Sequence, residues 1–218
     1  MDAGILAAQG VPVVNPLPVS WLGLTTAPVQ PPTWSNIGPL NNTQIKNLLA
    51  QIGYDQSAWD YTPVGNNNTL GRYQITPALL ESYGLLATGS NAAYGNSCVN
   101  YRHCWQPAYI NNGQNVYENY FYNITNLTEF LNTPVAQEHL AYQRISDLYV
   151  ESANAGVIQP RDSSETVAGM IYVAWALGVG QGPEDINSAW AWRYNNANST
   201  TGINKFNAGR YSVAVLSR

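Results

Sequence analysis

Residues 56–75 read QSAWDYTPVGNNNTLGRYQI, and this stretch decides how the rest of the chain is interpreted. The residues just before it carry a helical pattern, because apolar side chains recur at i, i+3, i+4 and i+7 from Ile45 to Ile52. This spacing predicts an amphipathic helix that runs into Gln56. A polar loop rich in Asn and Gly follows.

The stretch resembles, without a gap, the signature of lytic transglycosylases and goose-type lysozymes. That signature opens with Glu-Ser at the end of a helix and closes, after a polar loop, with Gly-x-Met-Gln-Ile or a near variant. The matching residues are Ser57, Gly71, Gln74 and Ile75, with Tyr73 in place of the methionine. Gln56 stands where the family has its catalytic glutamic acid.

The change at Gln56 has a direct chemical consequence. The resemblance implies an enzyme that protonates a glycosidic oxygen with one carboxylic acid and then uses the same group as a base. An amide has the shape of a carboxylic acid and can donate a hydrogen bond, but it cannot give up a proton. Since general acid–base catalysis contributes roughly 10²–10⁴-fold, we expect the chain to have lost cleavage while its groove can still bind glycan.

A second block of the same family resemblance lies about a hundred residues downstream. AWALGVG at 174–180 is similar to the family's Ala-Tyr-Asn-Ala-Gly-x-Gly, at the end of a helix that lines the groove. Trp175 replaces the tyrosine and Ala176 the asparagine. The resemblance implies substrate-binding positions at Ser57, Tyr73, Gln74, Tyr172, Trp175 and Ala176, and it covers residues 41–195.

The remaining pattern predicts a mainly α protein with a lysozyme-like helical domain at 41–218. Capped helices are expected within 76–84, 133–156, 163–177 and 182–196, with Glu184 and Asp185 in the first turn of the last one. Residues 90–122 are expected to form loops, because no alternating strand pattern exceeds four residues.

Residues 1–40 differ in composition from the rest of the chain. They are rich in Pro, Val and Thr without a helical period, which predicts an extended N-terminal arm. Such a segment is either a flexible leader or an arm that lies on a surface. Because it carries Trp21 and Trp34 and little charge, we expect it to bind a neighbouring subunit through these two residues.

Composition narrows the classes of partner. Only 10% of residues are charged and the net charge is −4, so no basic footprint for nucleic acid exists. No apolar run is long enough to cross a membrane, no signal peptide is evident, and no cofactor is indicated. These features suit a virion protein of the tail or baseplate, or an extracellular or periplasmic protein, whose partners are other virion subunits and peptidoglycan.

Other carboxylates are candidates to replace the missing acid. Asp60 lies in the loop and is the candidate that could reach the site, whereas a helical step turns Asp55 away from it. The remaining candidates, Glu81, Glu138 and Glu165, are expected on solvated helix faces. An active peptidoglycan-cleaving enzyme with a relocated carboxylate and a purely structural subunit are therefore the two alternative functions.

Cys98 and Cys104 flank a short loop and are expected to form a disulfide. The rival is a metal site that includes His103, but three ligands are one fewer than structural zinc sites use. His139 is expected to be a structural or surface histidine. The tyrosine-rich stretch 101–122 suits a saccharide cleft and a protein interface equally well.

Overall fold

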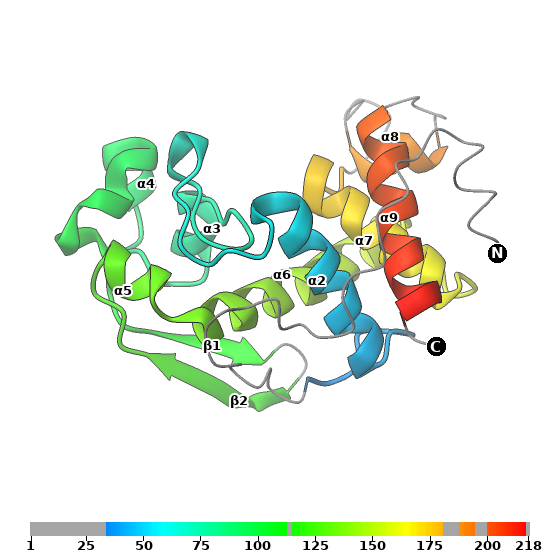
Figure 1. The fold of residues 1–218 in the computed structure, drawn as a ribbon, viewed down its shortest axis with the longest axis horizontal. Helices are drawn as coiled ribbons and strands as arrows, with labels where there is room; N and C mark the ends of the chain where they lie inside the picture. Colours follow the sequence, from blue (N-terminus) through cyan, green and yellow to red (C-terminus); the bar gives the residue numbers. More distant parts are fainter. Residues whose placement is uncertain (1–33, 113–114, 181–187, 195–199, 217–218) are drawn as a thin grey trace. The chain divides into compact units, whose positions relative to one another are not determined.

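The protein is mainly helical, with one small sheet in the part that is described (Figure 1). The computed structural model describes residues 34–112, 115–180, 188–194 and 200–216. The helices are α2 (Asn42–Ser57), α3 (Pro77–Ser82), α4 (Ser90–Tyr94), α5 (Leu127–Leu131), α6 (Pro134–Asn154), α7 (Ser164–Leu177), α8 (Ala189–Tyr194) and α9 (Thr200–Leu216), with 3₁₀ turns η1 (Asn66–Asn68), η2 (Gly95–Asn100) and η3 (Arg102–Cys104). None of the described helices combines the length and apolar character needed to cross a membrane.

The chain divides into two compact units. The motif unit contains the described residues 34–35 and 52–144, and the C-terminal unit contains 36–51 and the described residues from 145 onward. Helices α2 and α6 each contribute to both units.

The helices predicted before Gln56, within 76–84 and within 133–156 are confirmed. Helix α3 begins at Pro77, and the Thr76 hydroxyl caps it by accepting a hydrogen bond from the Leu79 N–H at 3.2 Å. Gly84 follows the helix at φ +75°, a conformation that glycine adopts without strain. The apolar side of α2 is buried as its period predicts, with Ile45, Leu48 and Ile52 fully buried.

A hairpin occupies part of the region predicted as loop. Strands β1 (Ala108–Asn112) and β2 (Asn115–Tyr122) pair antiparallel, with Ala108 opposite Tyr122 and Ile110 opposite Tyr120. The register shifts between Asn111 and Asn112. The prediction of loops alone was therefore wrong here, because the asparagines within both strands interrupt the apolar alternation that marks a strand in the sequence.

The predicted disulfide is absent. Cys98, in η2, and Cys104, at the end of η3, are both free and buried. Backbone hydrogen bonds close the two turns instead, since the Tyr101 N–H donates to Cys98 and the Cys104 N–H donates to Tyr101, each at 3.0 Å. Burial raises the pKa of the Cys98 thiol, which keeps it protonated as a small core side chain.

The end of the predicted arm belongs to the folded chain. Trp34 is buried, and its ring stacks on Tyr142 with centroids 5.0 Å apart and an interplanar angle of 16°. The Tyr142 hydroxyl donates to the Ser35 carbonyl at 2.8 Å. This corrects the prediction that Trp34 anchors a neighbouring subunit, because the indole is already covered by its own unit. Residues 1–33, with Trp21, lie outside the described residues.

The C-terminal unit is built around two helices that pack side by side, α7 and α9. Helix α7 is confirmed, with Ser163 as its N-cap, whereas α9 was not predicted. Glycines allow the close approach: a Cβ on Gly169 would lie 2.5 Å from the Phe206 ring, and one on Gly209 would lie 2.7 Å from the Ala168 carbonyl oxygen. The helix predicted within 182–196 is described only from Ala189 to Tyr194, so Glu184 and Asp185 lie outside the described residues.

Candidate functional site

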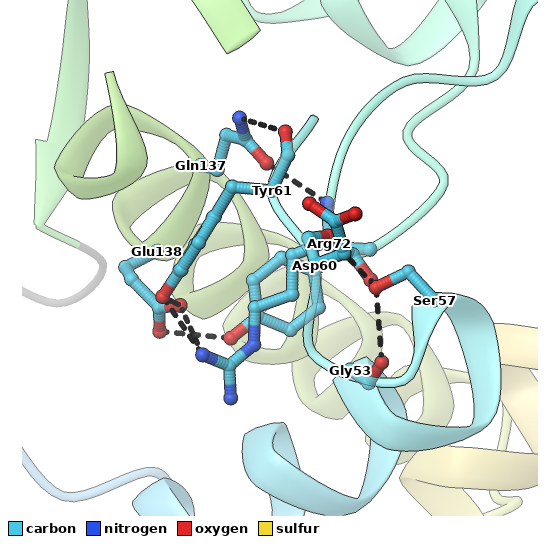
Figure 2. A network of polar contacts seen from close by, with 8 residues as sticks. Gly53, Ser57, Asp60, Tyr61, Arg72, Gln137 and Glu138 are labelled. Carbon is cyan, nitrogen blue, oxygen red and sulfur yellow. Dashed lines mark hydrogen bonds and ion pairs between the residues drawn. The ribbon is translucent and has the colours of Figure 1, made fainter. Parts of the chain in front are cut away.

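Gln56 lies in the last turn of α2 and is half-buried. Its neighbour Ser57 fastens the following loop to the helix, as Figure 2 shows. The Ser57 Oγ lies 2.8 Å from the Arg72 carbonyl oxygen and 2.9 Å from the Asp60 carbonyl oxygen. Ser57, predicted to contact substrate, thus holds both ends of the loop together.

The loop after Gln56 has an unusual backbone. It contains every non-glycine residue with positive φ in the described part of the chain: Ala58, Trp59, Asn67, Asn68 and Gln74. Such conformations cost of order 1–3 kcal/mol each and persist only where the surrounding contacts impose them. Short antiparallel bridges, Val64 to Leu70 and Leu70 to Ile75, close the loop on itself.

The glycine of the motif is required by both conformation and space. Gly71 has φ +67°, and a Cβ there would lie 2.1 Å from the side-chain oxygen of Gln137. That same oxygen accepts the Arg72 N–H at 2.9 Å, and the Gln137 amide group donates to the Tyr61 carbonyl at 3.1 Å. Gln137, fully buried on α6, therefore clamps both arms of the loop.

A buried network of charged and phenolic groups lies beneath the loop (Figure 2). Arg72 Nη1 is 3.4 Å from Glu138 Oε1, with side-chain exposures of 0% and 3%. Tyr61 donates to one Glu138 oxygen at 2.6 Å and Tyr73 to the other at 2.8 Å, while Arg72 donates to the Tyr61 hydroxyl at 2.7 Å. Each carboxylate oxygen thus receives a phenol, and the arginine links the loop to α6.

The pKa values of the two tyrosines suit a structural role for this network. Burial, and secondarily the Glu138 charge, raises the pKa of Tyr61 far above its usual value. Burial likewise raises the pKa of Tyr73. Both phenols therefore remain donors to Glu138. The prediction of a solvated face for Glu138 was wrong, and Tyr73, predicted to contact substrate, points into the core.

Gln74, also predicted to contact substrate, is engaged within the loop. Its amide nitrogen donates to the Gly71 carbonyl at 2.9 Å, and its oxygen accepts from the Thr69 hydroxyl at 2.7 Å. A Cβ on Gly65 would lie 1.9 Å from that oxygen. Gln74 thus braces the turn at its strained φ of +48°.

The other carboxylates are held in roles that do not suit a proton donor. Asp60 is exposed, and one of its oxygens accepts both the N–H and the hydroxyl of Thr62, each at 2.8 Å. Backbone hydrogen bonds from Asn91 and Gly89 lower the pKa of Glu81, and hydrogen bonds at the start of α7 lower that of Glu165. A catalytic acid of this type needs a raised pKa.

The second motif block ends its helix as predicted. Helix α7 stops at Leu177, and Gly178 and Gly180 have φ of +79° and +71°. Ala176 is exposed and Trp175 half-buried, so both can meet a ligand. Tyr172 cannot, because it is fully buried and accepts a hydrogen bond from Lys205 of α9 at 3.2 Å; its prediction as a substrate contact is corrected.

An aromatic pair brackets Gln56 in the chain. Tyr54 is 41% exposed, and its ring lies 4.7 Å from that of Trp59, at an angle of 45°. Trp59 reaches this position with φ +69°, although a bulky side chain disfavours positive φ. Tyr54 is exposed and Trp59 is half-buried, so part of each ring is open to solvent, and such a ring surface is suited to stack on a sugar face.

Sequence reasoning missed Tyr61, Arg72 and Gln137 altogether. The sequence did contain one signal for this network. Arg72 follows the glycine of the motif, with tyrosines at 61 and 73, and a buried guanidinium must find hydrogen-bond acceptors. Its acceptor on α6 is 66 positions away from Arg72 and could not be identified by spacing. Among the described residues, no three His, Cys, Asp or Glu side chains gather into a group that could hold a metal ion.

Comparisons with protein-family models, with curated proteins and with solved structures found no match to this chain.

Proposed function

We propose that this chain is a lysozyme-like domain, similar to lytic transglycosylases, that retains a glycan-binding scaffold without the catalytic acid. We further propose that it serves in a virion, in the tail or baseplate, as a structural or glycan-binding component. The observation that carries the proposal is Gln56 itself, which lies half-buried at the end of α2, at the head of a loop held in one conformation. An amide at this position can orient a sugar but cannot protonate it.

The surroundings of Gln56 support binding without cleavage. Glu138, the buried carboxylate of this unit, is occupied by two phenols and a guanidinium. Asp60 is bonded to Thr62. The pair formed by the exposed Tyr54 and the half-buried Trp59 supplies a stacking surface for a glycan. The low charge and amide-rich composition suit a protein embedded in an assembly.

The first experiment measures binding of purified peptidoglycan glycan strands. We expect the wild-type chain to bind strands, and Trp59→Ala to weaken binding about fivefold or more, as loss of an aromatic anchor does. Val150→Ala removes an exposed apolar side chain from α6 and is the control. Absence of any strand binding by the wild type would leave the purely structural role.

The second experiment restores the missing groups. Gln56→Glu supplies a carboxyl at the family position, but Ala176 still lacks the family's asparagine. We therefore expect little cleavage from Gln56→Glu alone and more from Gln56→Glu combined with Ala176→Asn, measured as soluble fragments released from cell walls. High and equal activity of both variants would remove Ala176 from the proposal.

A further inference from the structure

The motif unit carries a second group of exposed aromatic rings, formed by Tyr94, Tyr101 and His103. Each ring contacts the other two, with centroids 5.3 Å apart for the tyrosines and 5.2 and 5.7 Å from His103 to Tyr94 and Tyr101. Tyr94 is 46% and Tyr101 43% exposed. Such a ring cluster offers apolar faces with hydroxyl and imidazole edges toward solvent.

The segment that bears the ring cluster is anchored in the core. Tyr101 and His103 lie at and within the 3₁₀ turns that the buried Cys98 and Cys104 anchor in the core. The turn is also tied to the motif loop, because the Asn68 side chain donates to the Asn96 carbonyl at 2.9 Å. The strained Asn68 thereby links the loop after Gln56 to the segment that bears the rings.

A pocket adjoins the same segment, because α4 supplies residues to both. Its volume is about 500 Å³, within the range of small-ligand sites. The lining residues are Ala78, Glu81, Ser82, Thr88, Asn91 and Ala92. Asn91 and Ala92 lie on α4, which ends at Tyr94 of the ring cluster.

Two of the polar residues that line the pocket, Glu81 and Asn91, provide hydrogen-bond acceptors. The two Glu81 oxygens accept the Gly89 and Asn91 N–H groups, each at 2.7 Å, and these bonds lower the pKa of Glu81, so it remains a carboxylate. The Ser82 hydroxyl donates its proton to the Leu79 carbonyl. The Asn91 side-chain oxygen is buried and accepts no hydrogen bond from any described residue.

These features select the chemistry of a ligand. It must bring hydrogen-bond donors for Glu81 and for the Asn91 oxygen, and a small apolar group for the methyls of Ala78 and Ala92. A neutral polyol with an acetamido substituent has all three: hydroxyl donors, an amide N–H and a methyl. A buried acceptor left unpaired costs about 1–3 kcal/mol, so the site gains from an N–H that reaches it.

We propose that the α3–α4 pocket binds one N-acetylhexosamine residue of a glycan, with an adjoining sugar stacked on Tyr94 and Tyr101. The acetamido N–H donates to Asn91, the acetyl methyl contacts Ala78 and Ala92, and a ring hydroxyl donates to Glu81. This proposal rests on the proposed glycan-binding function and assigns it a second contact, apart from Gln56.

The test uses the full chain and two defined probes, tri-N-acetylchitotriose and cellotriose, which lacks the acetamido groups. Titration calorimetry should give at least about tenfold tighter binding of the acetylated trimer, because one hydrogen bond to a buried acceptor is at stake. Asn91→Ala should remove that preference, and Tyr94→Ala should weaken both probes. Val150→Ala, an exposed apolar position outside the site, is the control, and thermal unfolding verifies that each variant is folded.

A second variant guards against indirect effects of Asn91→Ala. Ala92→Leu fills the pocket from an exposed helical position that favours leucine, and it should abolish binding of the acetylated trimer. Equal affinity for the two trimers, or unchanged affinity in both Asn91→Ala and Ala92→Leu, overturns the pocket. If the pocket fails but glycan strands still bind through Trp59, the proposed function stands without the pocket. If the acetylated trimer binds but glycan strands do not, the pocket stands and the proposed function is contradicted.

Discussion

The motif loop and the α7–α9 pair are stabilised in opposite ways. The loop at 58–74 concentrates the non-glycine positive φ angles of the described chain above a buried ion pair and two phenols. Helices α7 and α9 meet through glycines and apolar side chains, and eight consecutive residues of α7, Val167 to Ala174, are buried. The motif loop combines a strained backbone with buried charge, whereas the α7–α9 pair relies mainly on close apolar packing.

This difference shows where the fold is specialised. Apolar packing alone can hold helices together, and a buried ion pair adds little net stability compared with apolar residues of the same volume. Its use beneath the loop therefore serves geometry: Arg72 and Glu138 impose one conformation on the segment that follows Gln56. Under the proposed function, Gln56 heads a binding site derived from an active site, in which the precise geometry is kept without a reactive carboxyl.

The largest expected effect comes from breaking the buried pair. Glu138→Ala leaves Arg72 buried without its carboxylate, which should lower the free energy of unfolding by about 3–5 kcal/mol in denaturant titrations. Glu151→Ala, on an exposed position of the same helix, should stay within about 0.5 kcal/mol. If Glu138→Ala lowers the free energy of unfolding no more than Glu151→Ala does, the buried network does not stabilise the loop.

A second contrast sets one glycine of the loop against one of the helix pair. Gly71→Ala meets both a left-handed φ and the Gln137 side chain, so we expect a loss of about 2–4 kcal/mol. Gly209→Ala meets the Ala168 backbone without a positive φ and should cost about 1–3 kcal/mol. Gly89→Ala isolates the conformational cost, because φ is +85° there and nothing lies within 4 Å of the added carbon. Thermal and denaturant unfolding of the three variants measure these costs.

A smaller, pH-dependent effect distinguishes two neighbours on α6. Glu138 is buried with a charge partner, whereas His139 is buried beside the Tyr122 hydroxyl, and burial lowers its pKa to about 4. The unfolded chain therefore binds a proton that the folded chain rejects between about pH 6.5 and 4. The free energy of unfolding should therefore fall as the pH is lowered across this window, by at most about 3 kcal/mol.

The variant that tests this effect is His139→Asn. The asparagine at 139 removes the titrating group while keeping an acceptor for Tyr122, so the slope of unfolding free energy against pH should flatten in this window. Identical slopes in the wild type and in this variant would contradict the assignment to His139.

Local patterns predicted the helices well. The period from Ile45 to Ile52, Pro77 after Thr76, and the glycines after α7 all mark elements or ends that the structure has. These signals are local because they reflect backbone hydrogen bonding and capping over a few residues. Helix α9 was missed because its glycines and polar residues obscure its helical period.

The site was predicted less well because burial depends on contacts that are distant in sequence. Tyr73 lies within the first motif block and Tyr172 just before the second, yet both side chains are buried in the core. Glu138 follows Gln137 on a helix whose polar residues read as a solvated face, and only its pairing with Arg72 allows it to be buried. The two cysteines were spaced for a disulfide, but core packing holds them as free thiols.

The most direct measurement is turnover by the unmodified chain. Purified peptidoglycan is incubated with the wild-type protein, and released soluble glycan fragments are separated and identified by mass spectrometry beside an active transglycosylase. Because Gln56 cannot protonate the glycosidic oxygen, we predict binding of strands without released fragments. Fragment release at a rate comparable to that of the active enzyme would contradict the loss of cleavage and identify a relocated carboxylate as the acid.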